Sequence, residues 1–166
     1  MDSLRRILIF GNSGSGKSTL AKQINCRLDI PHFDLDCIAW RPSVPPSRRP
    51  LDESRAEILR FTNGRDEWVI EGCYADLLEL AAPFATEAVF LNLPINVCLS
   101  NARRRPWEPH KYESKEAQDA NLVMLLDWIS QYESRTDEFS LSAHTQFFES
   151  FKGKKMMLRE NSSFFD

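Results

Sequence analysis

The sequence predicts a three-layer α/β protein in which helices cover both faces of a parallel β-sheet. Short apolar runs alternate with helical stretches along the chain, and this alternation is typical of strand–helix–strand units. The predicted strands are apolar at nearly every position, as strands buried on both faces are. The chain has 166 residues, of which 42% are hydrophobic, and this length allows a substantial core within one domain. We therefore expect a single domain over residues 1–166.

The first half of the chain supplies three predicted strands and two predicted helices. The apolar run at residues 5–10 ends at Gly11, and residues 17–28 have apolar side chains at helical spacing and stop before Pro31. Residues 41–50 contain four of the nine prolines, so we expect a loop there. The other elements expected in this half are strands at 32–36 and 68–71 and a helix at 51–62.

The second half supplies two further strands. Its clearest amphipathic helix is expected at residues 118–134, where apolar side chains recur at spacings of three and four. Residues 106–114 are polar and contain prolines, so we expect a lid-like loop over residues 106–116. The other elements expected in this half are helices at 75–82, 95–105 and 140–151 and strands at 88–93 and 155–158.

Composition excludes several classes of protein. The net charge is −3 and the isoelectric point is about 5.7, so we expect no direct binding of nucleic acid. No apolar run approaches the roughly 18 residues of a membrane span, and the apolar run before Gly11 is too short for a signal peptide. The four cysteines show no CxxC spacing, so we expect reduced thiols in a cytoplasmic protein rather than a zinc site or disulfides.

Residues 11–18 carry the strongest motif. They fit the pattern GxxxxGK[ST] at every defined position, between a predicted strand and a predicted helix as the pattern requires. Its glycines let backbone N–H groups point at phosphate oxygens, and the helix that follows presents the positive end of its dipole. Lys17 would reach the β- and γ-phosphates of ATP, Ser18 would ligate Mg²⁺, and Thr19 would reach the α-phosphate. The alternative is a chance match on a strand–turn–helix. The expected phosphate-binding residues are Gly11, Asn12, Ser13, Gly14, Ser15, Gly16, Lys17, Ser18 and Thr19.

Three carboxylates follow predicted strands at the same edge of the sheet. Right-handed crossovers place the C-terminal ends of all strands at one edge, so Asp34, Asp36 and Glu71 should lie beside the phosphate-binding turn. Asp34 and Asp36 would point to one face of an extended segment. One would orient or deprotonate a substrate hydroxyl, and the other would hold a water of the Mg²⁺ shell. Glu71 ends an apolar run, as the Walker B acid does. The alternative for Asp34 and Asp36 is that they only cap the next helix or turn. The alternative for Glu71 is that it is a surface residue at the end of a strand.

Basic and aromatic residues near this edge are candidates for contact with substrate. Arg103, Arg104 and Arg105 end a predicted helix and precede the lid-like loop, where they would clamp phosphoryl charge. The alternative is that they only stabilise the helix C-terminus. The further candidates for the substrate site are Trp40, Arg49 and Tyr74, together with Asp34 and Asp36.

With these residues in place, the chain resembles the small-molecule kinase branch of the P-loop NTPase fold, the relatives of adenylate kinase and shikimate kinase. The stretches that carry the resemblance are GNSGSGKSTLA, IPHFDLDCIAWRP, WVIEGCY, VFLNLP and NARRR. Within this branch the chain is most similar to a bacterial group labelled "DNA topology modulation" proteins. The resemblance implies a five-stranded sheet of order 2-3-1-4-5 and a short lid. It also implies that Asp36 contacts the substrate, that Asp34 lies near Mg²⁺ and that Glu71 replaces a Mg²⁺-associated aspartate.

Two departures from these relatives bear on the acceptor. Adenylate kinases carry arginines that grip AMP where this chain reads CIAW and CYAD, which argues against AMP. Shikimate kinases carry a glycine-rich loop at the third strand, where only Gly72 occurs here, which argues against shikimate.

We therefore expect an ATP- and Mg²⁺-dependent phosphotransferase that acts on a small polar metabolite or nucleotide. Lys17, Asp36 and an arginine from residues 103–105 would be catalytic, and residues 37–62 would form the acceptor side. The alternative is a nucleotide-binding regulatory ATPase that acts as a switch or interaction protein. The sequence leaves the acceptor and the oligomeric state open.

Overall fold

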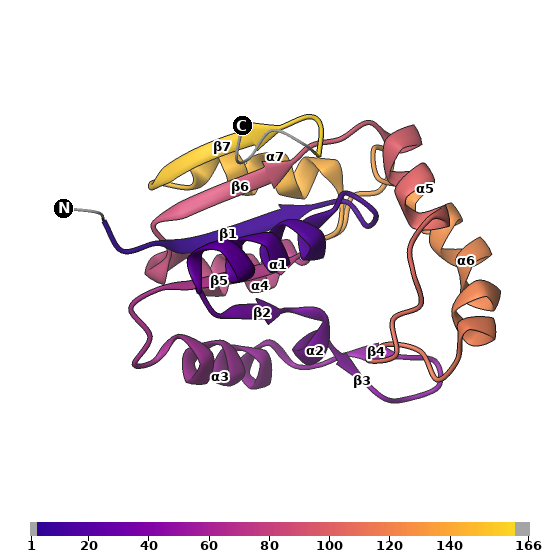
Figure 1. The fold of residues 1–166 in the computed structure, drawn as a ribbon, viewed down its shortest axis with the longest axis horizontal. Coiled ribbons are helices and arrows are strands. Elements are labelled where there is room, and N and C mark those ends of the chain that lie inside the picture. Colours follow the sequence, from indigo (N-terminus) through magenta and orange to yellow (C-terminus); the bar gives the residue numbers. More distant parts are fainter. Residues whose placement is uncertain (1–2, 162–166) are drawn as a thin grey trace.

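The computed structural model describes residues 3–161 and is built on a five-stranded parallel sheet of order β2-β5-β1-β6-β7. Numbered among themselves, these strands follow the order 2-3-1-4-5, so the expected α/β fold is confirmed (Figure 1). The strands are β1 (Arg6–Gly11), β2 (His32–Asp34), β5 (Trp68–Gly72), β6 (Glu87–Leu91) and β7 (Lys154–Leu158).

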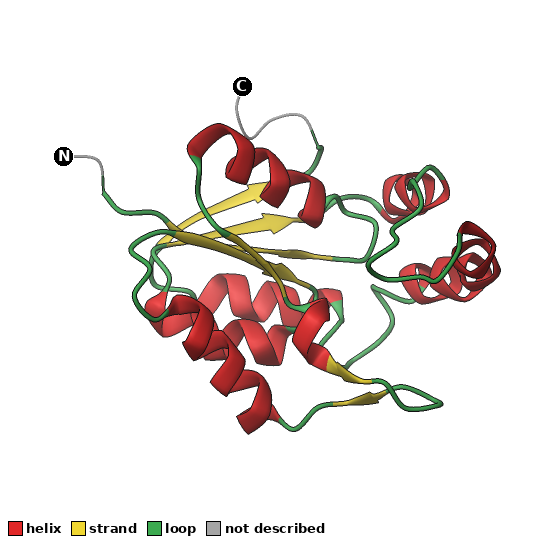
Figure 2. Ribbon diagram, turned by 60° about the horizontal axis from the view of Figure 1, so that its bottom comes forward, coloured by secondary structure: helices red, strands yellow, loops and turns green. Residues whose placement is uncertain are grey.

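Helices cover both faces of the sheet (Figure 2). Alternate side chains of β1 enter two separate cores, as the pleat of a strand requires. Ile7 and Ile9 pack in the core that includes α1, α5 and α6, while Leu8 and Phe10 pack in the core that includes α3, α4 and α7. The helices are α1 (Lys17–Leu28), α2 (Asp36–Ala39), α3 (Leu51–Thr62), α4 (Ala75–Ala81), α5 (Ile95–Arg103), α6 (Lys115–Ser130) and α7 (Leu141–Ser150), with a 3₁₀ turn η1 (Ala82–Phe84) after α4.

The second strand is shorter than expected. It ends at Asp34, and Asp36 begins α2 instead of continuing the strand. The reason is local, because the side chain of Asp34 accepts a hydrogen bond of 2.9 Å from the Asp36 N–H. Such a bond turns the backbone away from extended geometry.

Other boundaries also differ from the sequence prediction: α5 ends at Arg103, α6 ends at Ser130 and β6 ends at Leu91. The proline-rich segment contains a small antiparallel pair, β3 (Trp40–Arg41) and β4 (Ser47–Arg48), which the density of prolines concealed. Helix α6 begins at Lys115 rather than residue 118, since the Ser114 hydroxyl caps it by accepting from the Ala117 N–H at 3.0 Å. The lid-like loop therefore ends at Ser114.

Within residues 3–161, the helices are all too short or too polar to cross a bilayer.

Candidate active site

The turn between β1 and α1 has the geometry that anion binding requires. Gly14 and Gly16 adopt φ angles of 78° and 91°, a region that favours glycine. Helix α1 begins with no side-chain cap and no acidic residue in its first turn. Its first N–H groups therefore have no side-chain acceptor at the positive end of the helix dipole, as phosphate binding requires.

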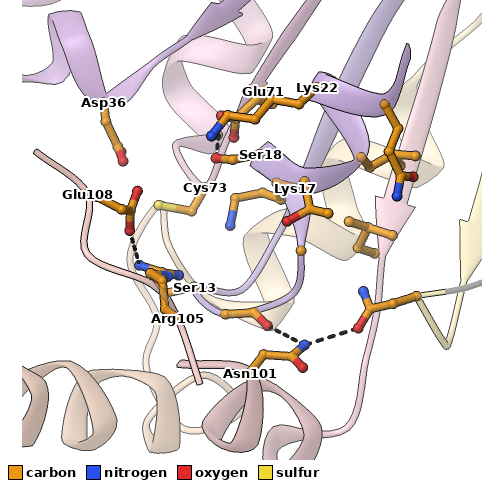
Figure 3. A pocket seen from close by; sticks show the side chains of 18 of the residues that line it. Ser13, Lys17, Ser18, Lys22, Asp36, Glu71, Cys73, Asn101, Arg105 and Glu108 are labelled. Carbon is orange, nitrogen blue, oxygen red and sulfur yellow. Dashed lines mark hydrogen bonds and ion pairs between the residues drawn. The ribbon is translucent and has the colours of Figure 1, made fainter. Parts of the chain in front are cut away.

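Lys17 lies at this turn and points into the cavity beside it (Figure 3). Its ammonium donates a hydrogen bond of 2.7 Å to the carbonyl oxygen of Asn12. The Asn12 side chain is buried and donates to the Ile129 carbonyl at 3.2 Å, so it supports the turn from behind. Ser15 is fully buried, and its hydroxyl has no hydrogen-bond partner in the described structure.

Ser18 and Glu71 meet at the carboxyl edge of the sheet. The Ser18 hydroxyl donates to Oε1 of Glu71 at 2.7 Å, and Glu71 is only 2% exposed. Strand register sets this position, because Glu71 pairs with Ile9 of β1 on one side and with Asp34 of β2 on the other. A hydroxyl and a carboxylate at the end of the phosphate turn are ligands that suit Mg²⁺.

The lid-like loop reaches across the cavity to the paired aspartates. The Lys111 ammonium lies 3.0 Å from Oδ2 of Asp36 and 3.7 Å from Oδ2 of Asp34. The expectation that both aspartates face one side therefore agrees with the geometry. Figure 3 shows Asp36 pointing toward the cavity from the side opposite Arg105.

The two aspartates have different electrostatic surroundings. Burial, with the charges of Glu71 and Asp36, raises the pKa of Asp34 to about 6. Loss of solvent also acts to raise the pKa of Asp36, but the Lys111 ammonium and a hydrogen bond from Tyr74 hold it below its usual range. Asp36 therefore stays ionised to a lower pH than Asp34, and divergent pKa values of this kind separate roles in a site.

Tyr74 contacts Asp36 and Trp40 contacts Tyr74, and neither aromatic residue lines the cavity. The Tyr74 hydroxyl donates to Oδ1 of Asp36 at 2.5 Å and accepts from the Trp40 indole N–H at 2.8 Å. The ring of Tyr74 is buried, and the guanidinium of Arg48 stacks over it at 4.9 Å. Tyr74 therefore fixes the orientation of the Asp36 carboxylate, and Trp40 fixes Tyr74.

The arginines divide into two groups. Arg104 and Arg105 line the cavity, whereas Arg103 does not. Arg105 lies 3.3 Å from Oε1 of Glu108. Arg49 lies away from the cavity and pairs with Glu53 at 3.4 Å. The geometry therefore brings Arg104 and Arg105, but not Arg103 or Arg49, to the expected site.

Residues of the phosphate turn, together with Asp36, Glu71, Arg104 and Arg105, line a cavity of about 440 Å³. The lining residues that the sequence analysis did not single out include Lys22, Cys73, Asn101, Glu108, Lys111 and Asn161. Lys111 and Glu108 belong to the polar loop, where their charges were a visible signal. Nothing in the local sequence marked Asn101 or Asn161.

The described residues hold no group of three or more His, Cys, Asp or Glu side chains placed as a preformed metal cage. Mg²⁺ bound to a nucleotide needs no such cage, because it keeps waters and phosphate oxygens in its shell. Ser18 and Glu71, with Asp34 beside Glu71, fit such a cation, and the uncapped helix α1 with Lys17 fits the phosphates.

The fold and the phosphate turn define a P-loop NTPase. The chain matches the family model described as "AAA domain" over residues 7–121 and belongs to that family.

The chain is similar to one relative in sequence and to two solved structures. The "Uncharacterized protein YqaC" of Bacillus subtilis (strain 168) is 26% identical over 135 residues, 78% of this chain and 74% of that protein. A sugar kinase from Janibacter sp. HTCC2649 superposes with a TM-score of 0.53 at 12% identity, over 94% of this chain and 85% of that one. A gluconokinase from Sinorhizobium meliloti 1021 gives a TM-score of 0.48 at 17% identity, over 90% and 99%. Only the shared fold follows from the likeness to the Janibacter sugar kinase, and these relatives do not bear on the narrower "DNA topology modulation" resemblance.

Proposed function

We propose that this protein is an ATP- and Mg²⁺-dependent phosphotransferase that acts on a small polar acceptor bearing a hydroxyl group. The observation that carries the proposal is that one cavity joins the phosphate turn, with Lys17, to the Asp36 carboxylate. A phosphoryl donor and an acceptor hydroxyl could then meet in line within it, and phosphoryl transfer depends mainly on such positioning and on electrostatic stabilisation.

Each residue has a role in this proposal. The first N–H groups of α1 and the Lys17 ammonium would hold the phosphate chain of ATP. Ser18 and Glu71 would hold Mg²⁺, directly or through water, and Asp34 would contact its water shell. Bound Mg²⁺ would supply positive charge to the transferring phosphoryl group.

Asp36 would orient the acceptor hydroxyl and take its proton as the phosphoryl group leaves ADP. Arg104 and Arg105 would stabilise negative charge at the transferring group. Lys111 and Asp36 form an ion pair in this structure. This ion pair would have to break when the acceptor hydroxyl approaches Asp36.

Two cations near the acceptor side are already paired with carboxylates. Lys111 contacts Asp36, and Arg48 contacts Asp76 at 3.2 Å and Glu138 at 2.7 Å. Within residues 3–161, these two pairings reduce the positive charge available to an acceptor phosphate, which favours an uncharged hydroxyl compound over a nucleoside monophosphate.

The test is a screen of hydroxyl compounds for stabilisation of the protein in the presence of Mg²⁺ and a non-hydrolysable ATP analogue, since an acceptor that binds the folded state raises its melting temperature. Hits are then assayed for ADP release with ATP. The Lys17→Ala variant should lose about 3 kcal/mol of transition-state stabilisation, roughly a hundredfold in turnover. The matched control is Lys152→Ala, because Lys152 is exposed and lies outside the cavity.

The outcomes separate the two candidate classes. Acceptor-dependent ADP release that Lys17→Ala abolishes supports the phosphotransferase. Slow ATP hydrolysis that no acceptor stimulates would favour a nucleotide switch instead. Equal ATP turnover in the wild type and Lys17→Ala would overturn both.

A further inference from the structure

Two asparagines from distant parts of the chain hold the backbone of the phosphate turn. The side-chain amide of Asn101, on α5, donates to the Gly14 carbonyl at 2.9 Å. The side-chain amide of Asn161, which follows β7, donates to the Ser15 carbonyl at 2.7 Å. The second N–H of Asn101 donates to Oδ1 of Asn161 at 3.0 Å, so the two side chains form one bridged pair.

From this geometry we propose that Asn101 and Asn161 are positioning residues that preorganise the phosphate turn for a nucleotide. The inference rests on the phosphate site of the proposed function and does not involve the acceptor. Figure 3 shows Asn101 beneath the turn, with an interaction on each side of its amide.

The planarity of the peptide bond explains how a contact to a carbonyl can position an N–H. In a trans peptide the C=O and the N–H of the next residue point in opposite directions. The Ser15 carbonyl faces Asn161, so the Gly16 N–H is directed to the other side, away from that amide. Gly16 precedes the uncapped first turn of α1, and its N–H thereby joins the donors available to phosphate.

The same logic applies to the preceding peptide. The Gly14 carbonyl faces Asn101, and the Ser15 N–H donates in the other direction to the Asn12 carbonyl at 3.2 Å. That carbonyl also accepts from Lys17. Capture of the Gly14 carbonyl therefore keeps the turn folded around the oxygen on which the lysine rests.

Close packing supports a fixed arrangement rather than a passing contact. A Cβ atom added at Gly14 would lie 2.4 Å from the carbonyl oxygen of Cys98, and one added at Gly16 would lie 2.6 Å from Nδ2 of Asn161. The turn is thus held between α5 and the residues after β7. Donors fixed in advance bind a charged ligand without the cost of ordering them at that moment.

The experiment compares two ligands, both with Mg²⁺: a non-hydrolysable ATP analogue and inorganic tripolyphosphate, which has no base. Dissociation constants are measured for the wild type, Asn101→Ala, Asn161→Ala and the double variant. Each single variant should weaken both ligands by about 5- to 10-fold, the worth of one hydrogen bond. The double variant should lose less than the product of the single losses, because the two amides share a hydrogen bond.

The matched control is Asn25→Ala. Asn25 also donates from its side chain to a backbone carbonyl, that of Ile30 at 2.9 Å, but at the far end of α1. It should leave both dissociation constants unchanged. Thermal unfolding of every variant checks the fold, and Asn161 is exposed, so its truncation leaves an intact protein to measure.

Equal weakening of ATP analogue and tripolyphosphate supports the inference. Weakening of the ATP analogue alone would overturn it, because the asparagines would then contact the base or ribose. Unchanged affinities for both ligands would also overturn it while leaving the proposed function intact. A wild type that binds neither ligand would instead remove the proposed function itself.

Discussion

The Tyr74 hydroxyl donates a hydrogen bond of 2.5 Å to the Asp36 carboxylate. Tyr74 is 3% exposed, and it also receives the Trp40 indole N–H at 2.8 Å. The chain of donors runs from Trp40 through Tyr74 to Asp36, so the carboxylate is fixed at its Oδ1 atom. Its Oδ2 atom faces Lys111 at the cavity and is the oxygen that an acceptor hydroxyl would approach.

We predict that Asp36→Asn lowers acceptor-dependent turnover by about 10²- to 10⁴-fold, the usual loss when a general base is removed. ATP hydrolysis without an acceptor should change little, since water does not need this carboxylate. ADP release is measured with and without the acceptor found by the screen. Wild-type acceptor-dependent turnover in the variant would mean that Asp36 is not the catalytic base and only begins α2.

We predict a smaller and selective effect for Tyr74→Phe. The ring and its packing remain, but Asp36 loses one donor, so acceptor-dependent kcat should fall about 10-fold, the worth of a hydrogen bond to a charged group. The KM for ATP should not change. Tyr132→Phe is the matched control, since the buried Tyr132 hydroxyl contacts His144 at 2.7 Å instead. A similar fall in kcat for both variants would indicate a general loss of packing.

Glu71→Gln should raise the Mg²⁺ concentration needed for half-maximal activity. The amide keeps an oxygen for the Ser18 hydroxyl, which now lies 2.7 Å from the carboxylate, but it lacks the negative charge that attracts a divalent cation. ADP release across a Mg²⁺ titration measures the effect. Glu87→Gln is the control, because Glu87 begins β6 at the opposite end of the sheet and pairs with Arg5 at 2.8 Å. An unchanged Mg²⁺ requirement in Glu71→Gln would remove Glu71 from the cation site.

Residues 106–116, which are the lid-like loop and the first two residues of α6, should become protected from trypsin when the ATP analogue and the acceptor bind together. Lys111 now pairs with Asp36 across the cavity, and closure over both ligands would bury the loop and exclude water. Cleavage after Lys111 and Lys115 is followed by mass spectrometry. Cleavage after Arg60, on α3, serves as an internal reference. Equal rates with and without ligands would mean that the loop is static.

Much of this fold could be predicted because its signals are local. The helices at 17–28 and 51–62 match the structure to the residue, since apolar spacing agrees with flanking breakers at their ends. The phosphate turn carries its own pattern and needs no tertiary information. The strand pair β3–β4 was missed, because its residues lie among prolines that favour a loop.

The remaining parts of the site depend on long-range packing. Asn101 and Asn161 reach the phosphate turn from 87 and 146 residues away, and asparagine is too common in loops to signal such a role. Lys111 meets Asp36 only because the loop after α5 crosses the cavity. Tyr74 was expected to line the substrate site, but burial directs its hydroxyl to Asp36. The periodicity of a single sequence does not reveal these long-range side-chain contacts.

The stability of the protein should fall as the pH drops below about 6.5, because His144 is buried without charge. Burial lowers the pKa of His144 to about 4, and its ring lies 2.7 Å from both the Tyr132 hydroxyl and the Cys73 carbonyl. Between these pH values the unfolded chain takes up a proton on this histidine and the folded protein does not, so acid favours unfolding. The loss should reach about 3 kcal/mol near pH 4.

Urea unfolding across this range is compared with that of His144→Gln, which cannot take up the proton. The difference between the two proteins cancels the opposing effect of Asp34, whose raised pKa of about 6 makes stability fall as the pH rises over the same range. Parallel stability profiles of the wild type and His144→Gln between pH 4 and 6.5 would contradict this prediction. They would mean that His144 does not stay uncharged in the folded protein over that range.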